Sequence, residues 1–430
     1  MDLLVRSRKS PLPLGGPPAP APTTRAGRWH ATSDLGRLCA THPMMDAVID
    51  EIDGRRIRVG EQWLADFASC NYLGLDLDEE IIAAVPEYLR RWGTHPSWSR
   101  LLGSPVLYEQ IESDLTALLG AEDTLVMPTI THIHNSVIPA LAAKGAVFMD
   151  AQAHKTIYDG CAAATAQGAR VLRYRHDDLD QLAGMLEGSR QGPRLICMDG
   201  VNSMTGNAPD LASFAALARR HDALLYVDDA HGFGVIGERS PGESCVYGDR
   251  GNSIVRHCGE RYDNVVLVGG FSKAYSSLLA FLALPTAVKD YLKVTAAPYL
   301  YSGPSPVASL ATVIEGLRVN DLRGDALRAD LCRKTAVVLD RVHALGAFTP
   351  NTSGFPIIEL PLADGDDIDA VGRYLFGRGI YVTLAAYPLV PRHQVGFRVQ
   401  VTAANTDEEI AALVDVLSEV ADRFGFQPAP

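Results

Sequence analysis

Side chains suited to acid–base and nucleophilic chemistry stand in short groups along the middle of the chain. They are, in order, His154, Asp199, Ser203, Asp228, His231, Ser272 and Lys273. An unprotonated lysine amine attacks an aldehyde to form a Schiff base, and a nearby aspartate keeps a pyridine nitrogen protonated. Histidine and serine side chains can hydrogen-bond to a ring oxygen. These groups act together only if the fold brings them to one place.

Each group closely follows a short run of apolar residues. The runs are rich in Val, Ile and Leu and mostly lack the apolar–polar alternation of a sheet with one face in water. Segments with helical spacing, such as residues 178–188 and 211–222, lie between them. The pattern predicts parallel strands that are buried on both faces and joined by crossover helices. We expect strands at residues 124–127, 146–149, 170–174, 195–198, 223–227 and 265–268.

The carboxyl ends of parallel strands meet at one edge of a sheet, and ligands of α/β proteins bind there. The polar groups therefore predict a site for pyridoxal 5′-phosphate, with Lys273 as the Schiff-base lysine and Asp228 or Asp229 at the ring nitrogen. Backbone amides near Thr131 and His132, at a helix start, suit the phosphate. The remaining expected contacts are His154 on the ring face, and His231 and Ser203 at the phenolic oxygen.

From about residue 60 to the C-terminus, six segments resemble the motifs of one enzyme family in order and spacing. They are residues 71–75 (NYLGL), 154–160 (HKTIYDG), 199–206 (DGVNSMTG), 227–237 (VDDAHGFGVIG), 271–273 (FSK) and 396–405 (GFRVQVTAAN). The family is the α-oxoamine synthases, pyridoxal-phosphate enzymes that join an amino acid to an acyl thioester and release carbon dioxide. The resemblance implies Asp228 at the ring nitrogen and His231 at the phenolic oxygen. It also implies that Arg398 binds the amino-acid carboxylate and that Asn71 lies at the substrate.

Several positions depart from the family's pattern. Gly270 stands where the family usually carries a threonine whose hydroxyl contacts the phosphate. We expect Ser272, or Ser302 across a dimer interface, to supply that hydroxyl. Residues 275–279 and 386–389 also differ from the family's segments on the acyl side of the site. The sequence therefore defines the cofactor half of the site better than the acyl half.

The resemblance implies a decarboxylating condensation that yields an α-amino ketone. In it, Lys273 removes the α-proton, the carbanion attacks the thioester, and His154 polarises the thioester carbonyl. The acyl group arrives on coenzyme A or on an acyl carrier protein, and a homodimer shares the active site. Because a fold does not select which bond at the α-carbon breaks, the alternative is an aminotransferase, a decarboxylase or an aldol-type lyase. A non-catalytic scaffold is a third hypothesis, which the presence of Lys273 and Asp228 disfavours.

The expected fold is that of the fold-type I pyridoxal-phosphate transferases: a large α/β domain with a mostly parallel sheet and a smaller C-terminal α+β domain. The proline-rich residues 1–30 predict a disordered leader. We assign residues 31–74 to an N-terminal segment, 75–305 to the large domain and 306–430 to the small one. The small domain is expected to hold helices at residues 306–317 and 326–345 and strands at 356–360, 379–384 and 396–401. Its last helix is expected to begin with a capping box of Thr406 and Glu409.

The composition agrees with an enzyme of the cytoplasm. Of 430 residues, 47% are hydrophobic and 21% charged, which is typical of soluble globular proteins. The net charge of −12 disfavours nucleic acid or an anionic membrane as partner, and no apolar run reaches the about 20 residues that span a bilayer. Seven scattered cysteines predict reduced thiols. His132 and His134 lack further ligands at suitable spacing, so we expect no metal.

Overall fold

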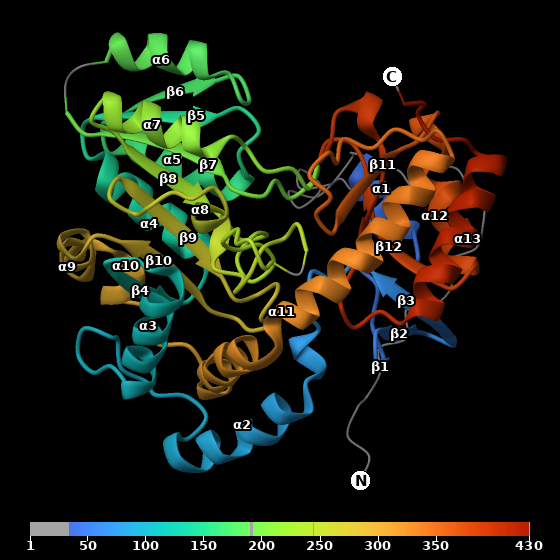
Figure 1. The fold of residues 1–430 in the computed structure, drawn as a ribbon, viewed down its shortest axis with the longest axis horizontal. Coiled ribbons are helices and arrows are strands. Elements are labelled where there is room, and N and C mark those ends of the chain that lie inside the picture. Colours follow the sequence, from blue (N-terminus) through green and yellow to red (C-terminus); the bar gives the residue numbers. More distant parts are fainter. Residues whose placement is uncertain (1–33, 190–191, 244, 430) are drawn as a thin grey trace, which may run out of the picture.

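The computed structural model of the protein describes residues 34–189, 192–243 and 245–429. These residues form two units, each built around one sheet, and a long helix connects them (Figure 1). The expected leader, residues 1–30, lies outside the described residues. Among the residues that the structure describes, no helix is both long and apolar enough to cross a membrane.

The large unit contains a seven-stranded sheet in the order β4-β10-β9-β8-β7-β5-β6. All six strands expected from the sequence are present. A seventh strand, β10, runs antiparallel between β4 and β9, and the other six are parallel to one another. The predicted α/β class with a mostly parallel sheet is therefore confirmed. The strands are β4 (Asp123–Met127), β5 (Ala146–Asp150), β6 (Arg170–Tyr174), β7 (Arg194–Asp199), β8 (Leu224–Asp228), β9 (Val265–Gly270) and β10 (Ala280–Leu284).

Helices cover both faces of this sheet, which explains why its strands are apolar throughout. Along β9, Val265 and Leu267 enter one hydrophobic core, while Val266 and Val268 enter the other. The second core is closed by α4 (Ile130–Ala142), α5 (Lys155–Ala166), α9 (Thr286–Thr295) and α10 (Ala297–Leu300). The first is closed by α3 (Val106–Leu119), α6 (Leu179–Glu187), α7 (Leu211–Arg220), α8 (Ser253–His257) and part of α11 (Val307–Ala344).

The small unit contains a six-stranded sheet in the order β1-β2-β3-β12-β13-β11. Its three C-terminal strands are those expected from the sequence. The other three come from the N-terminal segment, and β3 joins them to the C-terminal strands by pairing parallel to β12. The bounds are β1 (Glu51–Asp53), β2 (Arg56–Val59), β3 (Gln62–Phe67), β11 (Ile357–Pro361), β12 (Ile380–Ala385) and β13 (Gly396–Gln400). Its helices are α1 (Asp34–Thr41), α12 (Ile368–Gly377) and α13 (Asp407–Arg423).

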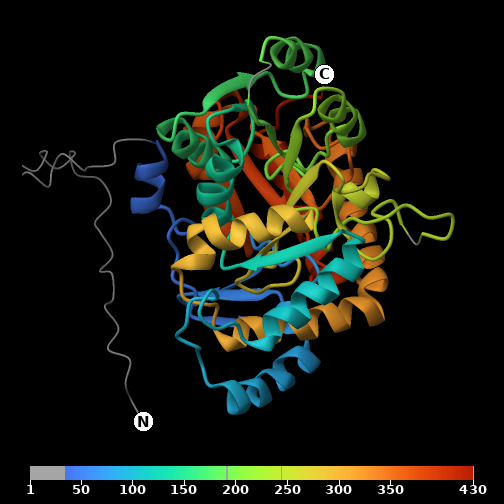
Figure 2. The same cartoon turned by 90° about the vertical axis from the view of Figure 1, so that its left-hand side faces the viewer.

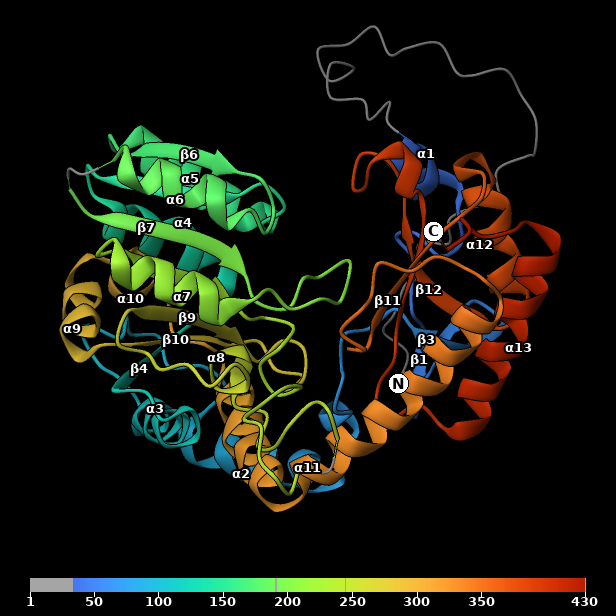
Figure 3. The ribbon, with the colours of Figure 1, turned by 45° about the horizontal axis from the view of Figure 1, so that its top comes forward.

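One unbroken helix, α11, occupies the region where two helical stretches were expected. Its first half packs along α2 (Glu79–Trp92), where the Tyr88 hydroxyl donates to Glu315 at 3.0 Å (Figure 2). Its second half packs against α13, whose predicted capping box of Thr406 and Glu409 is present. In the large unit, the carboxyl ends of the parallel strands point toward the small unit (Figure 3).

Candidate active site

A cavity of about 320 Å³ lies at the carboxyl ends of β7, β8 and β9. Its walls come from six separate stretches of the chain, so the fold brings together groups that are far apart in the sequence. Residues expected at the cofactor account for half of the lining: Thr131, His154, Ser203, Asp228, His231, Ser272 and Lys273.

The last residue of β8, Asp228, is buried, and each of its carboxylate oxygens has a hydrogen-bond partner. Its Oδ2 pairs with Nε2 of His134 at 2.9 Å, and its Oδ1 accepts the Ala230 N–H at 3.0 Å. Burial opposes the charge, but the hydrogen bond from His134 and the electrostatic effects of His134 and Lys273 outweigh it and hold the pKa of Asp228 below its usual range. Asp228 is therefore ionised at neutral pH, as required of a group that keeps a pyridine nitrogen protonated.

The partner of Asp228, His134, was not expected from the sequence. It is fully buried in α4, and its Nδ1 bonds to the Tyr226 hydroxyl at 2.8 Å. The sequence presented His134 only as half of a metal-like pair with His132. The one sequence signal for its burial is its position next to Ile133, among the residues that form the buried face of α4.

The neighbouring carboxyl, Asp229, turns away from the cavity. It is fully buried, and its Oδ2 accepts the Ile254 N–H at 2.9 Å. A Cβ atom at Gly200 or Gly232 would lie 2.6 or 2.1 Å from Asp229 Oδ1, so both positions need glycine. Asp229 therefore braces the turn after β8, and only Asp228 of the two lines the cavity.

His231 contacts the N-terminal part of the small unit. Its Nδ1 lies 2.8 Å from the hydroxyl of the buried Tyr72. Burial, followed by the positive charges of Lys273 and Arg398, lowers the pKa of His231 well below its usual value, so the ring is neutral. With Tyr72 as donor to Nδ1, the assigned tautomer carries its proton on Nε2, which leaves a hydrogen-bond donor for a ring oxygen.

His154 stands at the mouth of the cavity as the N-cap of α5. Its backbone N–H donates to Asp199 Oδ1 at 3.0 Å, and its Nδ1 bonds to the Thr156 hydroxyl at 2.8 Å. Burial lowers the pKa of His154, so the ring is neutral and suited to lie on an aromatic face. Burial and the charge of Asp228 raise the pKa of Asp199 to about 8.

Lys273 lies in the turn between β9 and β10 and lines the same cavity. Burial lowers its pKa, while the negative charge of Asp228 opposes that shift. A lowered pKa increases the share of unprotonated amine, which is the form that attacks an aldehyde and accepts a proton from carbon.

Hydroxyl groups and the start of α4 gather at one end of the cavity. Thr129 caps this helix by accepting the His132 N–H at 3.2 Å, and Thr131 and Ser272 line the cavity beside it. A Cβ at Gly270 would lie 2.6 Å from Ile130 Cδ1. The Ile130 side chain thus occupies the space that a threonine at position 270 needs. Free amides at a helix start and nearby hydroxyls are suited to a phosphate.

The small unit contributes Arg398 from β13. Its Nη1 donates to the backbone oxygen of Ser203 and contacts Met204 Sδ at 3.6 Å, in the turn after β7 that borders the cavity. Its Nε is buried and has no hydrogen-bond partner among the described residues. The guanidinium therefore lies at the edge of the cavity with donor capacity to spare.

Three residues expected at the site lie elsewhere within one chain. His132 is exposed on α4, and its ring contacts Thr129. Asn71 donates to Asp76 Oδ2 at 2.8 Å, and Asp76 is held by Arg55. The Ser302 hydroxyl donates to the adjacent Gly303 carbonyl at 3.2 Å. Their functional roles stay predictions, and that of Ser302 requires a second subunit.

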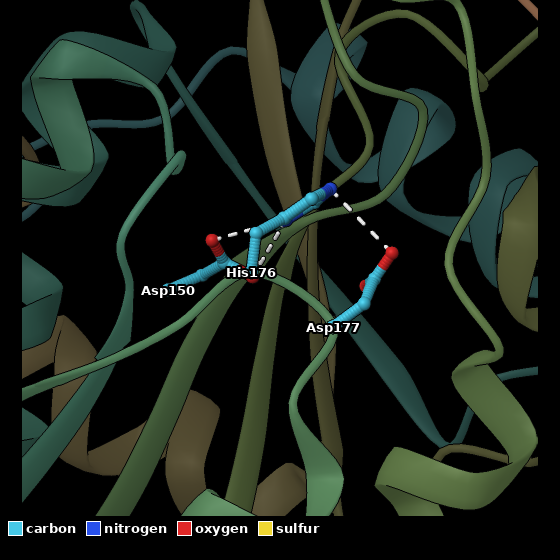
Figure 4. Close-up of side chains that lie close together, drawn as sticks. All are labelled: Asp150, His176 and Asp177. Atoms are coloured by element: carbon cyan, nitrogen blue, oxygen red, sulfur yellow. Dashed lines mark hydrogen bonds and ion pairs between the residues drawn. The ribbon is translucent and has the colours of Figure 1, made fainter. Parts of the chain in front are cut away.

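A second group of ionisable side chains lies beside the cavity, formed by Asp150, His176 and Asp177 (Figure 4). His176 Nδ1 lies 3.0 Å from Asp150 Oδ2, and its Nε2 lies 3.5 Å from Asp177 Oδ2. The hydrogen bond with Asp150 raises the pKa of His176. Both ring nitrogens face a carboxylate, an arrangement that favours the protonated imidazole.

The cavity as a whole fits pyridoxal phosphate. Hydroxyl groups suited to a phosphate, the ionised Asp228, Lys273 and two neutral histidines, His154 and His231, all line it. The buried hydrogen bonds of Asp228 and His231 fix these side chains before any ligand binds.

Comparison with known proteins agrees with this fit. The sequence profile of the family described as aminotransferase class I and II matches residues 64–417. An 8-amino-7-oxononanoate synthase of Dechloromonas aromatica is 31% identical, over 87% of this chain and 94% of that protein. A serine palmitoyltransferase of Caulobacter vibrioides is also 31% identical, over 92% of this chain and 94% of that protein.

A solved structure shares the fold. The serine palmitoyltransferase of Sphingomonas wittichii superposes with a TM-score of 0.80 at 25% identity, covering 87% of this chain and 92% of that chain. Both named relatives carry the activities that define the resemblance seen in the sequence. The chain belongs to the α-oxoamine synthases, pyridoxal-phosphate-dependent members of the class I and II aminotransferase family.

Proposed function

We propose that this enzyme joins an amino acid to an acyl thioester, with loss of carbon dioxide, and releases an α-amino ketone. The observation that carries the proposal is the shared cavity of Lys273, whose pKa is lowered, and Asp228, which stays ionised. The 31% identity to two condensing synthases over most of the chain supports this reaction over other chemistry on the same fold.

Each residue of the cavity has a distinct task in this proposal. Bound pyridoxal phosphate supplies an electron sink for negative charge at the α-carbon. The Lys273 amine removes the α-proton and returns a proton to the product. Asp228, held by His134, keeps its negative charge beside the ring nitrogen. His231 donates to the phenolic oxygen, and the neutral His154 covers the ring and polarises the thioester carbonyl.

Arg398 holds the amino-acid carboxylate at the edge of the cavity. Arginine suits this role because its planar guanidinium donates two parallel hydrogen bonds to a carboxylate. The unused Nε and the short reach to the Ser203 turn support the assignment. The carboxylate leaves as carbon dioxide after the new carbon–carbon bond forms, so Arg398 must bind it without preventing its release.

We infer a homodimer whose subunits share the active sites. Leu278, on the cavity wall, is 58% exposed, and Leu102 and Tyr301 are 81% and 82% exposed. Large apolar side chains that are exposed in one chain are typical of surfaces that a partner covers. In the dimer, Ser302 of the partner subunit would complete the phosphate site. We further infer coenzyme A or an acyl carrier protein as the thioester donor. A cytoplasmic location is in keeping with seven cysteines that form no disulfide.

The test is a comparison of the wild type with Lys273→Ala. Each purified protein is mixed with one amino acid and a panel of acyl-coenzyme A and acyl-carrier thioesters, and released thiol and carbon dioxide are measured together. The wild type should release both in equal amounts, and Lys273→Ala should be slower by at least about 100-fold because the proton-transfer group is gone. The visible absorption band of the bound cofactor should also shift in the variant.

Lys155→Ala is the matched control, because Lys155 is exposed next to His154 and pairs with Asp159. It should keep wild-type rates. Transfer of the amino group to a keto acid without thiol release would favour an aminotransferase instead, and equal thiol release by Lys273→Ala would refute the proposed role of the lysine.

A further inference from the structure

A buried carboxyl group lies directly opposite Arg398 on the neighbouring strand. Glu359 of β11 pairs with Arg398 of β13 in the antiparallel register. Side chains of directly opposed residues project from the same face, with Cβ atoms about 5 Å apart. Glu359 is only 3% exposed, and its Oε1 has no hydrogen-bond partner among the described residues.

Both members of this pair therefore have unused hydrogen-bonding capacity. Among the described residues, the buried Nε of Arg398 and the Oε1 of Glu359 have no hydrogen-bond partner, although one side chain offers donors and the other offers acceptors. A buried polar atom without a partner costs free energy, so such atoms deserve a functional explanation. These two atoms belong to directly paired strand residues, and Arg398 bonds to Ser203 of the cavity lining, so together they point to a ligand that bonds to both.

The surroundings of Glu359 make its protonation depend on Arg398. β11 is an edge strand, so within the described part of the chain it pairs with β13 alone, and Arg398 is the charged group that acts on Glu359. In the turn after β7, Arg398 contacts the Ser203 carbonyl and the Met204 thioether, neither of which titrates. Burial raises the pKa of Glu359 to about 7, with the positive charge of Arg398 acting in the opposite direction.

An amino-acid carboxylate at Arg398 would meet Glu359 at short range. If Glu359 is ionised, two negative charges compete for one guanidinium, and binding of the amino acid weakens. If Glu359 carries a proton, its hydroxyl is a hydrogen-bond donor, and the repulsion disappears. The two unpaired groups then match the two oxygens of one carboxylate.

We propose that Glu359 is a second substrate-binding residue of the carboxylate site, and that the amino acid binds with a proton on Glu359 and a hydrogen bond from its hydroxyl. The inference rests on the proposed function, because it assumes that Arg398 holds the amino-acid carboxylate. Binding of the substrate is thereby coupled to the uptake of one proton. In this proposal, Glu359 sets the affinity for the amino acid, and Lys273 carries out the later proton transfers.

The experiment is a titration of the holoenzyme with glycine, alanine and serine from about pH 6 to about pH 9, following the absorbance of the bound cofactor. For the wild type, the apparent dissociation constant should rise up to about tenfold per pH unit above about pH 7, because one proton must be taken up. Glu359→Gln keeps a donor and cannot ionise, so it should lack this added pH dependence. Glu359→Leu has no donor and should bind weakly at every pH.

Thr383→Val is the matched control. Thr383 faces Arg398 from the other neighbouring strand, β12, and carries no charge. It should retain the pH profile of the wild type. A Glu359→Gln profile identical to that of the wild type would overturn the inference while leaving the proposed function intact, and tight binding by Glu359→Leu at about pH 6 would overturn the donor role. If none of the amino acids alters the wild-type spectrum, the proposed function itself fails.

Discussion

At the scale of single residues, the charge of Asp228 depends on one hidden neighbour. His134 supplies the hydrogen bond that offsets the cost of burying this carboxylate. In His134→Leu, Asp228 loses a charge-assisted hydrogen bond worth about 1.5–3 kcal/mol, so its pKa should rise. We expect affinity for pyridoxal phosphate to fall roughly 10- to 100-fold, measured by fluorescence titration of the apoenzyme.

Asn135→Ala on the same helix provides the comparison for this prediction. Asn135 is exposed and next to His134, so its substitution should leave cofactor affinity unchanged. Equal affinities in the wild type and His134→Leu would show that Asp228 stays ionised without its partner.

At the scale of elements, the position of His134 depends on how closely α4 and α5 pack. A Cβ at Gly160 of α5 would lie 2.4 Å from the His134 carbonyl oxygen, so Gly160→Ala must push the helices apart. Such overpacking costs about 1–3 kcal/mol and should lower both the urea midpoint and cofactor affinity. Gly184→Ala in α6 has no atom within 4 Å of the new Cβ and should stabilise the protein by up to about 1 kcal/mol. A Gly160→Ala protein as stable as Gly184→Ala would contradict this packing argument.

The elements that could be predicted are those whose burial leaves a pattern in their own local sequence. The six parallel strands are buried on both faces, and continuous apolar runs reveal this directly. Strand β10 was missed because its sequence, Ala-Phe-Leu-Ala-Leu, consists largely of residues that favour helices. Strands β1, β2 and β3 pair with one another locally, but β3 also pairs with β12 near the other end of the chain, and no local pattern indicates that pairing.

The same distinction holds within the site. Residues at strand ends, such as Lys273 and Asp228, were predictable because parallel strands share one edge. His134, Tyr72 and Glu359 reach the site through contacts between elements that are distant in sequence. Each is an ordinary buried polar residue until its partner is known, so spacing and residue type could not identify them.

At the scale of the whole molecule, the large exposed apolar side chains predict that activity requires two subunits. Leu102→Asp or Tyr301→Asp should shift the protein to monomers in sedimentation velocity and remove most activity, because a charge in an apolar interface stays unpaired. Val337→Asp, at an exposed site in the second half of α11, should remain dimeric. A wild type that sediments as a fully active monomer would refute the shared site.

The pairing of β3 with β12 also sets an order of events during synthesis. Ala65 leaves the ribosome early, yet its partner Ile380 follows only after the whole large unit has been made. At about 5–20 residues per second, β3 remains on the order of tens of seconds without its parallel neighbour β12. The large unit can fold in that interval, whereas the small unit, which carries Arg398, is completed last. The cavity residues of the large unit, including Lys273, can therefore be in place before Arg398 is available to bind the carboxylate of an amino acid.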